Sequence, residues 1–269
     1  MTATRQKKAK ASIPATTAAA SRPLPKLLSF EGKTVAVTGA ANGIGRATAK
    51  AAAELGASLL LVDRAPLAEV AAELQALGTK VATLEGDLTE AGFIARMIDM
   101  GPIDAMAHCA GILGRTPMHK APSPAERFHQ TLDVNVRVPI ELGMALIEHM
   151  APRGGGSIVM IGSVAGRTGG TSLSTPIDYS ASKGAVHVVI RWLSRQAVGR
   201  GVLINGVAPG PVKTGMTAGS TVDPKSLPRG SMGTPEEIAW MIMMLLTPAA
   251  SYVSGAILDI TGGSYVGGR

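Results

Sequence analysis

The chain has 269 residues, 46% of them hydrophobic and 3% aromatic, so it is long enough to bury a large core packed mainly from aliphatic side chains. Its single cysteine, Cys109, excludes an intrachain disulfide and is typical of a reducing compartment, so we expect a cytoplasmic protein. No apolar run approaches the roughly 18 residues that a membrane span requires, and no membrane association is expected.

The formal net charge of +7 is concentrated near the N-terminus. The first 30 residues hold six basic side chains and no acid, which leaves +1 (7 − 6) for the remainder. Residues 1–29 show no apolar period, so we expect a flexible basic arm. An organelle-targeting segment, a weak polyanion-binding arm and a segment that packs on a neighbouring subunit are alternatives. Because the charge lies in the arm, no nucleic-acid surface is expected on the folded body.

From residue 30 onward, short apolar runs alternate with helical patterns. The predicted strands cover residues 34–38, 57–62, 80–84, 104–108, 157–161, 202–207 and 256–260. The predicted helices cover residues 46–55, 66–77, 90–100, 124–149 with a break at Pro139, 178–198 and 235–246. Such alternation of near-continuously apolar strands with helices predicts an α/β fold: a Rossmann-like, doubly wound parallel sheet of about seven strands with helices on both faces. No linker interrupts residues 30–269, so we predict one domain there.

Three glycines, Gly39, Gly43 and Gly45, lie between the first predicted strand and the first predicted helix. Glycine lets the backbone turn sharply and approach a pyrophosphate, and the helix N-terminus offers free N–H groups to it. The strand before and the helix after are the context that such a dinucleotide-binding turn requires. The alternative is an ordinary tight turn.

Tyr179 and Lys183 are four residues apart in a predicted helix and therefore lie on one face. A phenol titrates near ~10, and a neighbouring positive charge favours the phenolate. The spacing therefore predicts a tyrosine whose pKa is lowered by lysine, suited to proton transfer.

The motif Thr38-Gly39-x-x-x-Gly43-Ile44-Gly45 resembles the glycine motif of the classical short-chain dehydrogenases/reductases, and the resemblance extends over about residues 32–263. The resemblance implies that Asn135, Ser163, Tyr179 and Lys183 are catalytic. It implies no metal site and a cofactor site formed by Gly39, Asn42, Gly43, Ile44, Gly45, Asp63, Arg64, Asp87, Leu88, Ala110, Gly111, Tyr179, Lys183, Pro209, Gly210, Val212 and Thr214. One departure is His108-Cys109, where the family has two asparagines. We expect a hydrogen-bonded sheet histidine and a buried cysteine there.

The resemblance also predicts which dinucleotide is used. Asp63 ends the second predicted strand, where an acid accepts hydrogen bonds from the adenosine ribose hydroxyls. A carboxylate there would repel a 2′-phosphate, so we predict NAD, with NADP the less favoured cofactor. Arg64 is the opposing signal, because its guanidinium could reach such a phosphate.

The implied activity is the NAD(P)-dependent interconversion of a secondary alcohol and its ketone. Tyr179 would be the general acid or base, with Lys183 lowering its pKa and holding the nicotinamide ribose. Ser163 would donate a hydrogen bond to the substrate oxygen, and Asn135 would anchor a water that connects Lys183 to solvent. Polyols, cyclic alcohols, hydroxysteroids and 3-oxoacyl thioesters are all compatible substrates. There are two alternatives. The chain could be a catalytically silent, NAD-binding regulatory protein, or it could bind nucleic acid through its basic arm.

Residues 112–122, 164–177 and 211–230 are predicted to line the substrate pocket, where Arg167 or Lys213 could bind an anionic group. The family resemblance further implies a homotetramer, or a dimer, that uses the helices at about 138–149 and 178–198 as interfaces.

Overall fold

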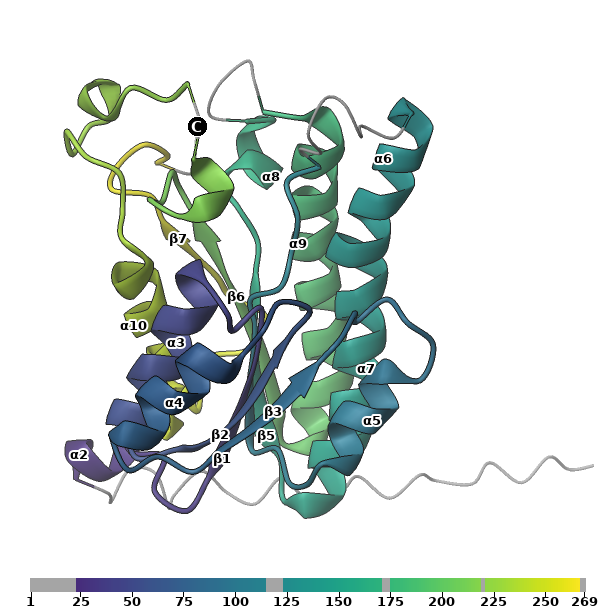
Figure 1. The fold of residues 1–269 in the computed structure, drawn as a ribbon, viewed down its shortest axis with the longest axis vertical. Coiled ribbons are helices and arrows are strands. Elements are labelled where there is room, and N and C mark those ends of the chain that lie inside the picture. Colours follow the sequence, from purple (N-terminus) through teal and green to yellow (C-terminus); the bar gives the residue numbers. More distant parts are fainter. Residues whose placement is uncertain (1–22, 115–122, 171–174, 219–220, 267–269) are drawn as a thin grey trace, which may run out of the picture.

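The computed structural model describes residues 23–114, 123–170, 175–218 and 221–266, and within them the chain forms one sheet of seven strands (Figure 1). The strand order is β3-β2-β1-β4-β5-β6-β7. The strands are β1 (Thr34–Thr38), β2 (Ser58–Asp63), β3 (Val81–Glu85), β4 (Ala105–His108), β5 (Gly156–Ile161), β6 (Val202–Pro209) and β7 (Ile257–Ile260). Every neighbouring pair is parallel, which confirms the predicted doubly wound α/β sheet.

Helices cover both faces of this sheet (Figure 1). They are α2 (Leu24–Leu27), α3 (Gly43–Glu54), α4 (Ala68–Ala76), α5 (Phe93–Asp99), α6 (Pro124–Leu132), α7 (Val138–Met150), α8 (Ala165–Thr168), α9 (Ile177–Ala197) and α10 (Pro235–Leu246). Buried side chains of α3, α4 and α10 pack on one face, and those of α5, α7 and α9 pack on the other. Each predicted helix is therefore present, with ends that differ by a few residues.

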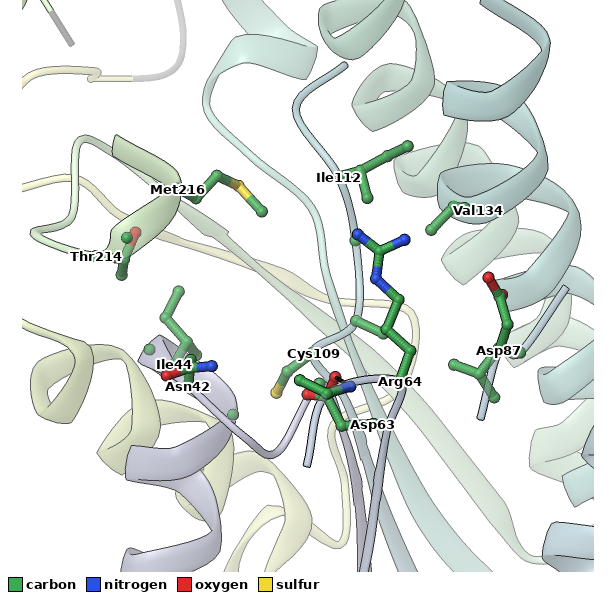
Figure 2. Close-up of a pocket in the computed structure, with 18 of the residues that line it drawn as sticks. Asn42, Ile44, Asp63, Arg64, Asp87, Cys109, Ile112, Val134, Thr214 and Met216 are labelled. Carbon is green, nitrogen blue, oxygen red and sulfur yellow. Dashed lines mark hydrogen bonds between the residues drawn. The ribbon is translucent and has the colours of Figure 1, made fainter. Parts of the chain in front are cut away.

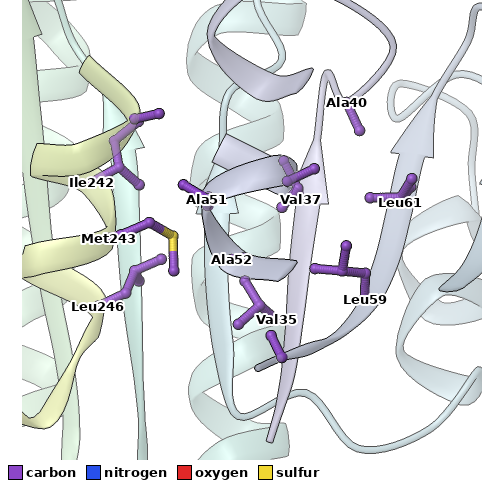
Figure 3. Close-up of a cluster of buried hydrophobic side chains, with 14 of the residues drawn as sticks. Val35, Val37, Ala40, Ala51, Ala52, Leu59, Leu61, Ile242, Met243 and Leu246 are labelled. Carbon is purple, nitrogen blue, oxygen red and sulfur yellow. The ribbon is translucent and has the colours of Figure 1, made fainter. Parts of the chain in front are cut away.

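The inner strands are apolar because each contributes to both cores. Val35 and Val37 of β1 pack under α3 and α10, whereas Ala36 between them faces the opposite core. Figure 3 shows Ile242 of α10 directed toward Ala51 of α3, whose small side chain allows the two helices to approach. The outer strands differ: β3 and β7 keep exposed positions, so the predicted near-continuous apolarity holds only for the strands with neighbours on both sides.

The break predicted at Pro139 is a wider turn in a continuous helical path. Residues Asp133–Arg137 form a π-helical segment (η2) between α6 and α7, and the Val138 N–H donates to the Asp133 carbonyl five residues back. Proline has no N–H to donate to the preceding turn, and a π segment absorbs such a missing bond without ending the helix. Asn135 lies in the middle of this segment.

The predicted basic arm lies mostly outside the described residues, which begin at residue 23. Its last part forms one helical turn, α2, beside the short 3₁₀ turn Pro248–Ala250 that follows α10. In the described part of the chain, no helix combines the length and apolarity needed to cross a bilayer.

Candidate active site

A cleft of about 870 Å³ opens at the carboxyl ends of the central strands. The sheet order reverses between β1 and β4, and ligands of open α/β sheets bind in the crevice beside that reversal. Of the residues predicted to bind cofactor, those lining the cleft are Gly39, Asn42, Gly43, Ile44, Gly45, Asp63, Arg64, Asp87, Leu88, Ala110, Gly111 and Thr214. Figure 2 shows Thr214 and Met216 on the wall opposite Asp87 and Val134.

The glycine loop closes one wall of the cleft, and two of its glycines are required sterically. Gly39 has φ +68°, and a Cβ there would lie 2.8 Å from the Ala110 backbone nitrogen. A Cβ on Gly45 would lie 1.9 Å from the Gly39 carbonyl oxygen, so only glycine lets α3 start this close to the loop. The N-cap, Asn42, makes no side-chain bond to the first turn of α3. The first N–H groups of α3 therefore remain available to a diphosphate, and the residues present fit a dinucleotide.

Asp63, the last residue of β2, is held in place by two backbone amides. Its Oδ2 accepts a hydrogen bond from the Ala41 N–H at 3.0 Å, and its Oδ1 accepts one from the Ala65 N–H at 2.9 Å. The carboxylate thus links the glycine loop to the turn after β2. Arg64 is exposed and makes no ion pair with any described residue, and Figure 2 shows it extending across the cleft toward Ile112 and Val134.

Tyr179 and Lys183 lie side by side on α9, as their spacing predicts. The Lys183 Nζ is 5.8 Å from the centre of the Tyr179 ring and donates a hydrogen bond of 2.9 Å to the Ile161 carbonyl. Burial lowers the pKa of Lys183 to about 8. Burial also raises the pKa of Tyr179, and a hydrogen bond with Ser163 opposes that shift. The predicted lowering of the tyrosine pKa is therefore wrong for the chain itself, because removal from water outweighs the effects that favour the phenolate.

Ser163 follows β5 and is fixed by its neighbours in the chain. Its Oγ accepts a hydrogen bond of 3.1 Å from the Ala165 N–H, and its own N–H donates to His187 Nε2 at 3.4 Å. The N–H of Val164 donates to the Pro209 carbonyl at 3.0 Å, which ties the turn to the end of β6. Since the Ser163 Oγ accepts within its own turn, its hydroxyl proton can be donated outward, and Tyr179 is its hydrogen-bond partner in the described residues.

Asn135 joins the loop after β4 to α9. Its Oδ1 accepts from the Ile112 N–H at 2.9 Å, and its Nδ2 donates to the Ile112 carbonyl at 2.8 Å and to Ser182 Oγ at 3.0 Å. A Cβ on Gly111 would lie 3.3 Å from both Asn135 Oδ1 and Lys183 Nζ. Because Gly111 lines the cleft, these two catalytic candidates lie directly behind its wall. The water that Asn135 is predicted to anchor stays a prediction.

His108 and Cys109 occupy the positions where the sequence departs from the family. His108 is buried, and its Nδ1 lies 2.8 Å from Thr38 Oγ1, as expected of a hydrogen-bonded sheet residue. Burial, with a smaller effect of Lys183, lowers the pKa of His108 to about 3. Burial raises the pKa of the Cys109 thiol to about 12, although this residue borders the cleft. The thiol is therefore protonated at neutral pH, which does not suit a nucleophile.

Five predicted cofactor residues are not among those that line the cleft. Tyr179 and Lys183 belong to α9, and Lys183 lies behind Gly111. The other three lie at the end of β6 and just after it. The Pro209 carbonyl faces Val164, Gly210 packs against Thr261, and the buried Val212 pairs with Gly233, so they shape the loop from behind. The cleft is also lined by residues not predicted to bind cofactor: Ala65, Gly86, Thr89, Cys109, Ile112, Val134, Lys213, Gly215, Met216 and Pro235. All of these except Val134 and Pro235 lie within two residues of a predicted cofactor residue, in a segment that follows a strand. Proximity to those segments could therefore have identified them from the sequence.

Other predictions fall partly outside the described residues. Of the predicted substrate-lining segments, residues 115–122, 171–174 and 219–220 lie there. Arg167, which the sequence suggested could bind an anionic group, is paired with Asp259 of β7. Among the described residues, no three His, Cys, Asp or Glu side chains group in a way that could hold a metal ion.

Comparison with known proteins identifies the family. The model of the short-chain dehydrogenase family matches residues 33–225. The chain belongs to the short-chain dehydrogenases. It is 37% identical to the galactitol 2-dehydrogenase (L-tagatose-forming) of Cereibacter sphaeroides, over 87% of this chain and 95% of that one.

Solved structures of this family have the same fold. A 3-oxoacyl (acyl-carrier-protein) reductase of Agrobacterium tumefaciens with NADP bound superposes with a TM-score of 0.80 at 30% identity, covering 90% of this chain and 98% of that one. A 7α-hydroxysteroid dehydrogenase with NADH and 7-oxo glycochenodeoxycholic acid gives a TM-score of 0.82 at 28% identity, covering 90% and 98%. As a short-chain dehydrogenase, the chain is an NAD(P)-dependent oxidoreductase acting on an alcohol or its ketone.

Proposed function

We propose that this short-chain dehydrogenase interconverts a secondary alcohol and its ketone with NAD, using Tyr179 as the general acid and base. The observation that carries the proposal is the position of Asn135 and Lys183 directly behind Gly111, in the wall of a cleft that Asp63 also lines. Tyr179 lies beside Lys183 and is hydrogen-bonded to Ser163. A nicotinamide dinucleotide, held by the glycine loop, Asp63 and Asp87, supplies the hydride acceptor or donor. The protein supplies orientation and proton transfer.

The proton chemistry is assigned to groups whose geometry is described above. The Tyr179 phenol gives its proton to the substrate oxygen in ketone reduction and removes it in alcohol oxidation. The Ser163 hydroxyl donates a hydrogen bond to the same oxygen as charge changes there. The buried ammonium of Lys183 stabilises the phenolate that remains after reduction. Asn135 holds the Ile112 backbone, and through it the wall in front of Lys183.

The preference for NAD rests on Asp63. A carboxylate fixed by two amides at the end of β2 keeps a negative charge where a 2′-phosphate would lie. We expect Asp63→Ala to raise the KM for NAD about 10- to 100-fold, the size expected when hydrogen bonds to a charged group worth ~1.5–3 kcal/mol are lost. The KM for NADP should stay equal or fall. Initial rates with both dinucleotides measure this.

Two matched variants separate charge from structure. Asp63→Asn removes the charge and keeps one oxygen, which can accept from only one of the Ala41 and Ala65 amides. It should therefore lose NAD preference with less disturbance of the loop than Asp63→Ala. Arg64→Ala should leave NAD kinetics unchanged. Preference of the unmodified enzyme for NADP, lost in Arg64→Ala, would contradict the proposal and assign the 2′-phosphate to Arg64.

The substrate is best sought among polyols first, because the galactitol dehydrogenase relative acts on one. Cyclic alcohols, hydroxysteroids and 3-oxoacyl thioesters complete the panel, assayed by NAD reduction or NADH oxidation. Turnover of at least one class that disappears in Tyr179→Phe supports the proposal. Dinucleotide binding without turnover of any class would favour the silent regulatory protein.

We propose that this enzyme is cytoplasmic and forms a homotetramer, with a homodimer as the alternative. Large apolar side chains are exposed on two separate helices: Trp192 is 51% exposed on α9 and Trp240 is 56% exposed on α10. Exposed apolar surface of this kind is typical of subunit contacts. We expect Trp192→Glu and Trp240→Glu each to reduce the solution mass by half and the double variant to be monomeric, as measured by light scattering. Leu77→Glu, at an exposed site just after the end of α4, is the control, and a monomeric unmodified enzyme would overturn the assembly.

A further inference from the structure

Arg167 connects the turn that follows β5 to the last strand and the residues just after it, at least 90 residues further along the chain. Its Nε donates to Asp259 Oδ1 of β7 at 2.7 Å, and a second guanidinium nitrogen donates to the Ile257 carbonyl at 3.3 Å. The guanidinium carbon lies 5.9 Å from the centre of the Tyr265 ring, beyond the end of β7. The side chains of Arg167 and Asp259 are only 19% and 29% exposed, so this pair is less screened by water than most surface ion pairs.

Arg167 belongs to α8, a helix that depends on its neighbours for position. With four residues, α8 is a single turn and has little stability of its own. On one side it packs backbone to backbone against α9: a Cβ on Gly166 would lie 2.6 Å from the Gly184 nitrogen and as close to the Lys183 carbonyl carbon. On the other side, the guanidinium of Arg167 fastens it to β7. The turn is therefore held between the helix of Tyr179 and the last strand of the sheet.

The same turn sets the position of Ser163. The Ser163 Oγ accepts its hydrogen bond from Ala165, the first residue of α8. A shift of α8 moves the Ala165 N–H, and with it the preferred direction of the Ser163 hydroxyl. A displacement of about 1 Å in a group that must meet a reacting atom lowers rates by as much as ~10²-fold. The fixation of α8 thus has a direct chemical consequence.

We propose that the Arg167–Asp259 ion pair positions the catalytic serine, so that β7 holds the Ser163 hydroxyl in its working orientation through α8. Arg167 is a positioning residue: it acts through Ser163 and touches neither substrate nor cofactor. The inference rests on the proposed role of Ser163 and adds the residues that hold it.

The test is a double-mutant cycle on the full chain. We expect Arg167→Ala and Asp259→Asn each to lower kcat about 5- to 20-fold, with the KM for the dinucleotide unchanged within twofold. In a Ser163→Ala background, adding Arg167→Ala should lower kcat no further, because the group it positions is already absent. Arg167→Lys, which keeps the charge and can still reach Asp259, should recover part of the loss.

Controls distinguish the possible failures. Arg96→Ala removes an exposed arginine that also pairs with an acid, Glu90, and covers an aromatic ring, Phe93, and it should leave kcat unchanged. The positioning role would be overturned if Arg167→Ala lowered kcat by the same factor in the Ser163→Ala background as in the original enzyme. It would also be overturned if Arg167→Ala lowered the melting temperature and left kcat intact. Either result would leave the proposed function standing. Unchanged kcat in Ser163→Ala alone would remove the proposed role of Ser163, and the positioning role with it.

Discussion

Replacing Tyr179 with phenylalanine is expected to lower kcat about 10³-fold, a loss of about 4 kcal/mol of transition-state stabilisation. The substitution removes one oxygen atom and keeps the ring beside Lys183. The dinucleotide KM and the melting temperature should therefore change little. Steady-state rates in both directions, with calorimetry of the variant, measure the effect.

The pKa of Tyr179 predicts which direction is favoured at neutral pH. Because burial raises this pKa, the phenol is protonated at pH 7 and is ready to donate in ketone reduction. Alcohol oxidation requires the phenolate and should accelerate as the pH rises, until Lys183, with a pKa of about 8, loses the charge that stabilises it. Tyr252→Phe, at a side chain 98% exposed, is the matched control and should not alter kcat. A Tyr179→Phe variant with more than a tenth of the original kcat would exclude this tyrosine as the acid and base.

The parts of the site that sequence predicts are those set by local spacing. The glycine loop needs only a strand, three glycines and a helix, and Gly39 and Gly45 lie where that pattern places them. Lys183 lies beside Tyr179 for an equally local reason, the four-residue repeat of a helix. The inner strands were predictable because burial on both faces requires an apolar residue at every position.

The parts that sequence does not predict depend on contacts between distant residues. Arg167 and Asp259 are 92 residues apart, and nothing in either segment indicates the other. Asn135 meets Ile112 because a π segment rotates it toward the loop after β4, whereas a proline in a helical pattern predicts a break. The direction of the Tyr179 pKa shift depends on how deeply α9 is buried, which residue spacing alone does not indicate.

The second large effect concerns stability in acid, where two buried histidines act in the same direction. The pKa of His108 is lowered to about 3 and that of His187 to about 4, both mainly by burial, whereas an unfolded imidazole titrates near 6.5. As the pH falls below 6.5, the unfolded chain binds protons that the native chain does not. The stability that these two neutral histidines contribute is therefore fully present above pH 6.5 and is lost progressively as the pH falls toward their native pKa values.

Each of these histidines should lower the free energy of unfolding by about 1.4 kcal/mol per pH unit in that window. His108→Asn removes one of them and keeps an amide that can bond to Thr38, so it should reduce the slope of stability against pH by about half. Partial burial also lowers the pKa of His149, so this residue adds a smaller contribution to the slope in both the original protein and the His108→Asn variant.

Urea titrations at half-unit steps from pH 7 to 5 measure this slope, above the range where the carboxyl groups with lowered pKa values begin to titrate. The exposed His129 provides the control, because His129→Asn should leave the slope unchanged. The His108 Nε2 is buried and has no hydrogen-bond partner among the described residues, so the asparagine variant should also be at least as stable as the original at pH 5. An unchanged slope in His108→Asn would mean that this imidazole accepts a proton in the native protein, and that the buried end of β4 is open to water.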